Sequence, residues 1–206
     1  MYFTFGGGFL ALSKQAKILS DKQVGAVLRE LGNHRYPARD RTMFLLSIKA
    51  GMRAIEIAHV TWSMVTDAEG NIAEAIALEN KASKGKRGGR IIPLHPDLKA
   101  ALVALHRERG EAARSNLPVI FSERARGLSP GAVTVWFFRL YAGLNMVGCS
   151  SHSGRRTFLT KAARRVSEVG GSLRDVQQLA GHANLATTAL YIATDQDAQR
   201  KLVALV

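Results

Sequence analysis

Cysteine is nearly absent from this sequence, and so is any long apolar run. The single cysteine of the 206 residues, Cys149, excludes an internal disulfide framework and a multi-cysteine metal site and indicates a reducing compartment. Residues 1–12 are apolar, but three consecutive glycines interrupt them, no basic segment precedes them, and they are too short to span a bilayer. We therefore expect a cytoplasmic, nucleoid-associated location without a membrane partner, and interpret residues 1–18 as a flexible or loosely docked arm.

Acidic residues are also few. The chain has 16 aspartates and glutamates against 29 lysines and arginines, a net charge of +13. Such a protein attracts polyanions, so nucleic acid is the leading partner class, although ribosomal proteins and membrane-surface proteins share this balance.

Capping residues followed by apolar residues at helical spacing predict helices along most of the chain. The segment Ser20-Asp-Lys-Gln23 has the pattern of a capping box, and Gly51 can end a helix in the left-handed conformation. The first four predicted helices begin at about residue 21, at Asp40, at Arg53 and at Pro96. The next four begin after Ser129, at about residue 152 with Ser150 or Ser151 as the cap, after Ser172, and after Asn184, and the last of them is expected to carry Tyr191.

A change of pattern interrupts the helices between residues 72 and 94. Two short extended segments, Ile76-Ala-Leu78 and Ile91-Ile92, flank a basic, glycine-rich turn. The sequence therefore predicts a basic β-hairpin and a mainly α fold with a small antiparallel sheet (α+β), in one domain from residue 19 to residue 206.

His152 and Arg155 are three residues apart on a predicted helix, so one phosphate can touch both side chains. Arg155 offers a planar fork of donors to phosphate oxygens, and His152 can donate to them or move a proton near neutral pH. The alternative is a solvated basic helix, because Arg156 and other cationic residues follow closely.

Three further residues are candidates for the same site. Arg53 precedes a predicted helix, where a guanidinium and a helix N-terminus can address one anion. His182 and Tyr191 lie about 13 Å apart if one helix joins them, but Gly181 and Asn184 indicate a break that folds the chain back. Taken singly, Arg53 is equally explained as a surface arginine and Tyr191 as a packing residue.

Five motifs occur in order along the chain. They are Gly51-Met-Arg53-Ala-Ile-Glu56, Lys84 before Arg90-Ile-Ile-Pro-Leu94, His152-Ser-Gly-Arg155, Leu179-Ala-Gly-His182 and Thr187-Thr-Ala-Leu-Tyr191. Each alone is weakly specific. Together, over residues 19–193, they resemble the catalytic domain of the tyrosine recombinase (phage integrase) family.

The resemblance implies a site-specific DNA recombinase that cuts and rejoins strands without metal, nucleotide or other cofactor. Tyr191 would be the nucleophile, giving a 3′-phosphotyrosine and a free 5′-hydroxyl. Arg53 and Arg155 would hold the non-bridging oxygens and offset charge in the transition state, and Lys84 would protonate the departing oxygen. A phenol with a pKa of about 10 is a poor nucleophile without such nearby cations.

The resemblance assigns lesser roles to other residues. His152 and His182 would assist proton transfer and position the phosphate, and Glu56 would support the first arginine. We expect the DNA backbone to be contacted by Lys81, Lys86, Arg87, Arg90 and Arg156.

The chain departs from the family pattern in several ways. Ala180 stands where a leucine is common, the connection from Arg155 to His182 is somewhat long, and Gly154 stands before the second arginine, where the family usually has an aliphatic residue. A glycine inside a helix costs about 1 kcal/mol relative to alanine, so this helix is expected to begin later or to be looser. The N-terminal core-binding domain typical of the family is expected to be absent, which would weaken DNA affinity.

The partners implied are double-stranded DNA, further copies of the chain in a tetramer on synapsed DNA, and an accessory DNA-binding protein or a separate core-binding domain. A short amphipathic helix over residues 195–206 would dock on a neighbouring subunit or on its own domain. Two alternatives stay open: a non-catalytic DNA-binding module of the same fold, and a type IB topoisomerase.

Overall fold

The computed structural model describes residues 15–82, 89–124, 127–191 and 203. The elements run α1 (Asp21–Leu31), α2 (Pro37–Lys49), α3 (Ala54–His59), η1 (Trp62–Met64), β1 (Ala75–Leu78), η2 (Asn80–Ala82), β2 (Arg90–Pro93), α4 (Pro96–Arg109), η4 (Gly110–Ala112), α5 (Pro130–Gly143), α6 (Ser153–Arg165), η5 (Val166–Val169), α7 (Leu173–Ala180) and α8 (Leu185–Ala189). The predicted fold class, mainly α with a two-stranded antiparallel sheet, is confirmed.

Helix α2 lies at the centre of the main core. It packs against α4 and α6, and α3 packs against α5. Its apolar residues are buried almost without exception, including Met43, Phe44, Leu45 and Leu46 at 0% exposure. Because α2 is buried on nearly all sides, its sequence lacks the separate apolar and polar faces of a surface helix.

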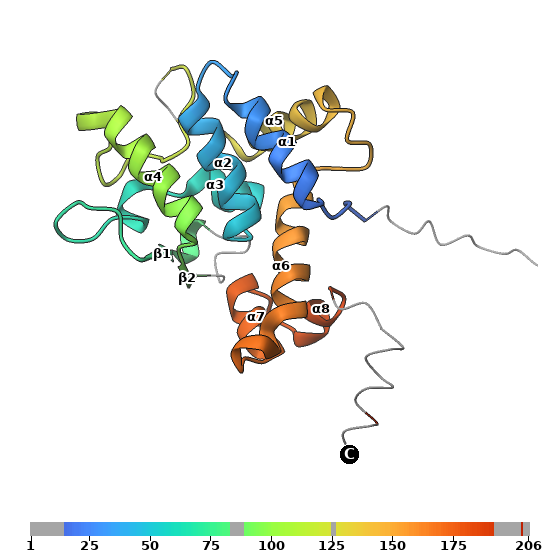
Figure 1. Cartoon of the computed structure of the whole chain (residues 1–206). Coiled ribbons are helices and arrows are strands. Elements are labelled where there is room, and N and C mark those ends of the chain that lie inside the picture. Colours follow the sequence, from blue (N-terminus) through green and yellow to red (C-terminus); the bar gives the residue numbers. More distant parts are fainter. Residues whose placement is uncertain (1–14, 83–88, 125–126, 192–202, 204–206) are drawn as a thin grey trace, which may run out of the picture.

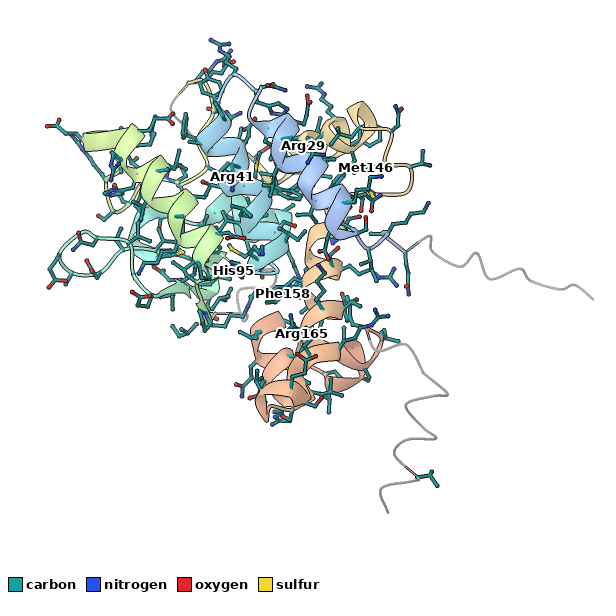
Figure 2. The ribbon with its side chains drawn as sticks, viewed as in Figure 1. Arg29, Arg41, His95, Met146, Phe158 and Arg165 are labelled. Carbon is teal, nitrogen blue, oxygen red and sulfur yellow. The ribbon has the colours of Figure 1, made fainter. Side chains whose placement is uncertain are left out.

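A second, smaller core holds the C-terminal helices. Leu159 and Ala163 of α6 pack there with Val176 and Ala180 of α7. Helix α6 runs from the main body down to α7 and α8 (Figure 1), and Phe158 lies on the stretch where it leaves that body (Figure 2). Helix α6 therefore contributes side chains to the smaller core and also packs against α2 of the main core.

The β-hairpin has the predicted form. Ile76 of β1 pairs with Ile92 of β2, and both side chains face the core at 0% and 1% exposure. The tip of the hairpin lies outside the described residues, and with it the predicted site residues Lys84, Lys86 and Arg87. The predicted helix over residues 195–206 falls outside them as well, apart from Val203.

The capping signals located most helix ends, but one start and one cap were wrong. Helix α2 begins at Pro37, because the fixed φ of proline suits a first helical position, whereas Asp40 is buried and bonded to His34 and Arg39. Helix α6 begins at Ser153, within one residue of the predicted start, but its N-cap is His152 and not Ser150 or Ser151.

The end of α8 also differs from the prediction. The helix stops at Ala189, with Leu190 as its C-cap. Tyr191 therefore lies just beyond the helix that was expected to carry it. None of the helices in the described ranges combines the length and apolarity needed to cross a membrane.

Candidate active site

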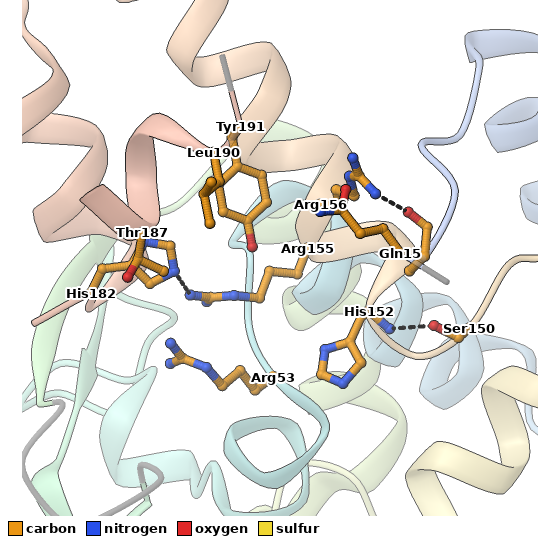
Figure 3. A pocket seen from close by; sticks show the side chains of 11 residues that line it. Gln15, Arg53, Ser150, His152, Arg155, Arg156, His182, Thr187, Leu190 and Tyr191 are labelled. Atoms are coloured by element: carbon orange, nitrogen blue, oxygen red, sulfur yellow. Dashed lines mark hydrogen bonds between the residues drawn. The ribbon is translucent and has the colours of Figure 1, made fainter. Parts of the chain in front are cut away.

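A pocket of about 420 Å³ opens where α6, the turn after α8 and the N-terminal segment meet. The five predicted catalytic residues that the structure describes line it together: Arg53, His152, Arg155, His182 and Tyr191 (Figure 3). The remaining lining residues are Gln15, Ala16, Ser150, Arg156, Thr187 and Leu190. The structure thus brings together predicted catalytic residues that are up to 138 positions apart in the sequence, from Arg53 to Tyr191.

Arg155 is held at the centre by main-chain oxygens. It lies in the first turn of α6 and is 4% exposed. One terminal nitrogen donates to the carbonyl of Gly51, and the other donates to the carbonyl of Ala180 at 2.7 Å and approaches His182 Nε2 at 3.0 Å. These contacts use three of the five N–H donors of a guanidinium, which leaves two for an anion in the pocket.

Backbone geometry explains why these carbonyls are available. Gly51 follows α2 with φ +63°, and Gly181 follows α7 with φ +60°, a left-handed conformation that glycine adopts without strain. Ala180 is the last residue of α7, and Gly51 lies two residues after Lys49, the last residue of α2, so Arg155 lies beyond the C-terminal ends of both helices, where a cation is favourable. A side chain on Gly51 would collide with the Phe158 ring, 2.5 Å from its Cβ position.

Glu56 is a buried acceptor that orients Arg53. Its side chain is 0% exposed. One carboxylate oxygen accepts from the Arg53 main-chain N–H at 2.8 Å, and the other accepts from the Arg53 guanidinium at 2.8 Å. The first contact is half of a capping box, since Arg53 is the N-cap of α3. The predicted supporting position of Glu56 beside the first arginine thus has a geometric basis.

Arg90 completes this network. Its guanidinium makes a two-pronged contact with Glu56, at 3.0 Å to each oxygen, and its Nε donates to the Leu179 carbonyl at 2.8 Å. The side chain is 7% exposed, and the backbone of Gly181 lies against it. Contact of Arg90 with DNA stays a prediction, but the observed partners of its guanidinium are protein groups that join β2, α3 and α7.

Glu56 carries a charge within this network. Burial acts to raise its pKa, but the hydrogen bonds and positive charges of Arg90 and Arg53 outweigh burial, so the pKa lies below its ordinary value. Burial, followed by the charge of Arg53, lowers the pKa of Arg155 to about 10. Both groups are therefore ionised at neutral pH, and the network stays cationic toward the pocket.

His182 and Tyr191 meet because the chain folds back after α7. Gly181 ends α7, and the Asn184 side chain caps α8 by accepting from the Ala186 N–H at 2.8 Å. The His182 and Tyr191 rings then stack, with centroids 5.8 Å apart and planes inclined by 20°. The predicted break between the two residues is confirmed, and the Tyr191 hydroxyl points into the pocket toward Arg155 (Figure 3).

His182 is neutral at physiological pH. Burial and the charges of Arg155, Arg53 and Arg90 lower its pKa to about 4. A neutral imidazole has one donor nitrogen and one acceptor nitrogen, so His182 can accept a hydrogen bond within an otherwise cationic site.

His152 and Arg156 lie at the rim of the pocket. His152 is exposed at the N-cap of α6, so it does not share a helical face with Arg155 as predicted, although both line the cavity. The guanidinium of Arg156 donates to the Ala16 carbonyl at 2.8 Å. Lys81 lies apart, 70% exposed and ion-paired with Glu79.

Two contributions to the site were missed by sequence reasoning. Residues 15 and 16 line the pocket although they fall in the predicted arm, and Lys17 donates its N–H to the Gly148 carbonyl at 3.1 Å. Thr188, fully buried, contacts His182 through its hydroxyl. Its place in the motif Thr187-Thr-Ala-Leu-Tyr191, between His182 and Tyr191 in the sequence, was the available signal.

The arrangement suits a phosphate or another anion. Two arginines with unused donors face a tyrosine hydroxyl in one pocket, and guanidinium groups fit phosphate oxygens in two-pronged geometry. Within residues 15–82, 89–124 and 127–191, no three histidine, cysteine, aspartate or glutamate side chains form a group able to hold a metal ion. The fold and site thus define a helical protein with a cationic pocket around a tyrosine.

Comparison with known proteins identifies the family to which this chain belongs. The model of the phage integrase family matches residues 17–198, and the chain belongs to that family. The tyrosine recombinase XerC of Xanthomonas campestris pv. campestris is 29% identical over 159 residues, which are 76% of this chain and 45% of the relative. The tyrosine recombinase XerA of Thermococcus onnurineus is 29% identical over 164 residues, 79% of this chain and 54% of the relative.

Solved structures share the fold. The Tn1549 transposon integrase, in complex with a circular intermediate DNA, aligns with TM-score 0.72 and 18% identity, over 93% of this chain and 66% of that one. The XerA recombinase aligns with TM-score 0.68 and 22% identity, over 91% of this chain and 64% of that one. The chain spans about half the length of the curated relatives it matches.

Proposed function

We propose that this chain is the catalytic domain of a tyrosine site-specific recombinase, which cuts and rejoins DNA through a covalent 3′-phosphotyrosine on Tyr191. The observation that carries the proposal is the shared pocket, in which Tyr191 faces Arg53 and Arg155. Family membership and the naming of the curated relatives as tyrosine recombinases support it.

The chemistry follows from the groups in the pocket. The Tyr191 oxygen attacks the scissile phosphorus, forming a P–O bond as the phenolic proton leaves and the bond to the 5′-oxygen breaks. The two arginines hold the non-bridging oxygens, where negative charge accumulates in the transition state. We assign protonation of the departing 5′-oxygen to Lys84, and assistance in proton transfer and phosphate positioning to His152 and His182.

The phosphotyrosine preserves the energy of the phosphodiester. A 5′-hydroxyl from a second strand can therefore attack it, reform a P–O bond and return the proton to Tyr191, with no nucleotide hydrolysed. The reaction is strand exchange when the attacking hydroxyl belongs to another duplex.

Double-stranded DNA is the proposed substrate. The net charge of +13 favours a polyanion, and among the structural neighbours are a XerH recombinase bound to its difH substrate and a lambda integrase dimer bound to a core site. On the same basis we expect tetramers on synapsed DNA, an accessory DNA-binding protein or a separate core-binding domain, and a cytoplasmic, nucleoid-associated location.

Covalent trapping tests the proposal. The full chain is incubated with nicked suicide duplexes that carry palindromic candidate core sites, and denaturing gels and peptide mass spectrometry locate any adduct. We expect an adduct on Tyr191 that is absent in Tyr191→Phe. The matched control is Tyr141→Phe, which removes a buried hydroxyl with no hydrogen-bond partner in the described part of the chain and leaves the pocket intact.

DNA binding without adduct formation would contradict the proposal. If the wild type binds these duplexes but yields no adduct with any of them, the chain acts as a DNA-binding module, and the catalytic proposal is wrong.

A further inference from the structure

Thr188 contacts both aromatic residues of the pocket. Its side-chain oxygen lies 3.0 Å from His182 Nδ1. Its main-chain carbonyl accepts from the Tyr191 N–H at 3.0 Å. The residue is 0% exposed, so water does not compete for either contact. One buried threonine therefore joins the ring of His182 to the backbone of Tyr191.

The other nitrogen of His182 determines where the proton lies. His182 Nε2 is 3.0 Å from a terminal nitrogen of Arg155, and a guanidinium can only donate. Nε2 must therefore carry the lone pair. The single proton of the neutral ring is then on Nδ1, which donates to Thr188 Oγ1.

The opposite tautomer is unfavourable in this geometry. A proton on Nε2 would face an N–H of Arg155, and Nδ1 would become an acceptor beside Thr188. One nitrogen would then meet a donor instead of an acceptor, and leaving a buried polar group unsatisfied costs about 1–3 kcal/mol. The main chain that carries the ring is held as well, because the Gln177 carbonyl accepts from the His182 N–H at 3.1 Å and the Gln177 side-chain amide donates to the His182 carbonyl at 2.9 Å.

We propose that Thr188 is a positioning residue: its hydroxyl accepts the Nδ1 proton of His182 and so holds the ring where Nε2 meets Arg155, and its carbonyl holds Tyr191 beside that ring. With Nε2 unprotonated, His182 accepts one N–H of Arg155 and helps to fix the plane of that guanidinium in the pocket. The catalytic consequence rests on the proposed function, whereas the tautomer is a property of the free protein.

The tautomer is measured directly by NMR of the imidazole nitrogens in ¹⁵N-labelled full-length protein. The His182 signals are assigned by their loss in His182→Gln. We expect wild-type His182 at pH 7 to show a protonated Nδ1 and an unprotonated Nε2. In Thr188→Val, which keeps the shape but removes the acceptor, Arg155 still excludes a proton from Nε2, so we expect the Nδ1 proton to remain but its ¹⁵N signal to shift and its exchange with water to become faster. Thr188→Ser restores the wild-type pattern.

A matched control separates positioning from stability. Thr42 is also 0% exposed, and its hydroxyl donates to the Ala38 carbonyl at 2.8 Å within the main core. Thr42→Val makes the same chemical change away from the pocket. We expect it to lower the melting temperature as Thr188→Val does, but to leave the His182 Nδ1 signal and its proton exchange unchanged.

Adduct formation provides the second readout. We expect the rate of adduct formation to fall about tenfold in Thr188→Val, the equivalent of one lost buried hydrogen bond, and to recover in Thr188→Ser. A wild-type His182 protonated on Nε2, or an Nδ1 signal unaffected by Thr188→Val, would overturn the assignment. An Nδ1 signal that responds as expected in a protein that never forms an adduct would uphold the assignment and reject the proposed function.

Discussion

Gly154 of α6 lies directly against Ser47 of α2. A Cβ atom built on Gly154 would be 2.3 Å from the Ser47 hydroxyl oxygen and 3.0 Å from its Cβ. Ser47 is fully buried and thus occupies the space that an aliphatic residue before Arg155 would need. The glycine that departs from the family pattern is therefore what allows α6 to approach α2, and this approach places Arg155 against the Gly51 carbonyl.

The Gly154–Ser47 contact predicts that the loss of stability caused by Gly154→Ala depends on the residue at position 47. Gly154→Ala gains helix propensity, but overpacking of this kind costs about 1–3 kcal/mol, so we expect a net loss of unfolding free energy. In a Ser47→Gly background the two shortest contacts disappear and only the main-chain carbon of residue 47 remains, at 3.3 Å. Urea unfolding of the wild type, the two single variants and the double variant tests this. If Gly154→Ala lowers the unfolding free energy equally in both backgrounds, Ser47 does not limit how closely α6 approaches α2.

The sequence predicted local structure better than it predicted this contact. Capping boxes at Ser20 and Ser172 located their helices because both partners of the box lie three residues apart in the chain. The Gly154–Ser47 contact joins residues that are distant in sequence, so no local pattern reveals it. For the same reason Gly154 was interpreted as a weakness of its helix instead of a packing requirement.

In the site, too, the sequence did not reveal contacts between residues that are distant along the chain. The motifs identified Arg53, Arg155 and Tyr191, which do share a pocket, but they gave no sign that Arg90 would be buried against Glu56. A basic residue beside a basic turn has the composition of a DNA contact. Only the three-dimensional arrangement reveals a carboxylate 34 positions earlier in the chain as its partner.

The buried pair of Arg90 and Glu56 gives the second prediction. Arg90→Met removes one partner and leaves a buried carboxylate with a single arginine, which we expect to cost about 3–5 kcal/mol of unfolding free energy. The control is Lys81→Met, which breaks an exposed pair with Glu79 and is expected to cost about 0–1 kcal/mol. Similar losses in the two variants would mean that burial adds nothing to the Arg90 contact.

The pH dependence of this pair has a definite sign. The folded-state pKa of Glu56 is depressed, so the stability that its charge contributes is present above its ordinary pKa of 4.5 and is lost as the pH falls through the folded value. The difference in unfolding free energy between wild type and Arg90→Met should therefore narrow below about pH 4.5. A constant difference from pH 7 to pH 3 would contradict the assignment.

His182 provides the third prediction. Its pKa is lowered from 6.5 to about 4 by burial and by the charges of Arg155, Arg53 and Arg90. Arg53→Gln removes one of those charges, so an NMR titration of the His182 ring should give a higher pKa in the variant, still below 6.5 because burial and Arg155 remain. Since the unfolded state binds the extra proton first, the contribution of His182 to stability falls as the pH drops from about 6.5 to about 4. His182→Gln should lack this fall.

Arg155 gives the last prediction, and the conservative substitution is the informative one. Lysine at this position keeps the charge but has only three donors on one nitrogen, so it cannot reach Gly51, Ala180 and the pocket at once. We expect Arg155→Lys to form the Tyr191 adduct at least about 100-fold more slowly, the cost of losing one preorganised donor to a developing negative charge. Binding to duplex DNA should change little, because non-specific affinity depends on the total charge that meets the phosphates.

Binding is measured by fluorescence anisotropy at two salt concentrations and adduct formation in the same buffer. If both fall in parallel, Arg155 serves mainly to hold DNA; if only adduct formation falls, it acts on the phosphate that reacts.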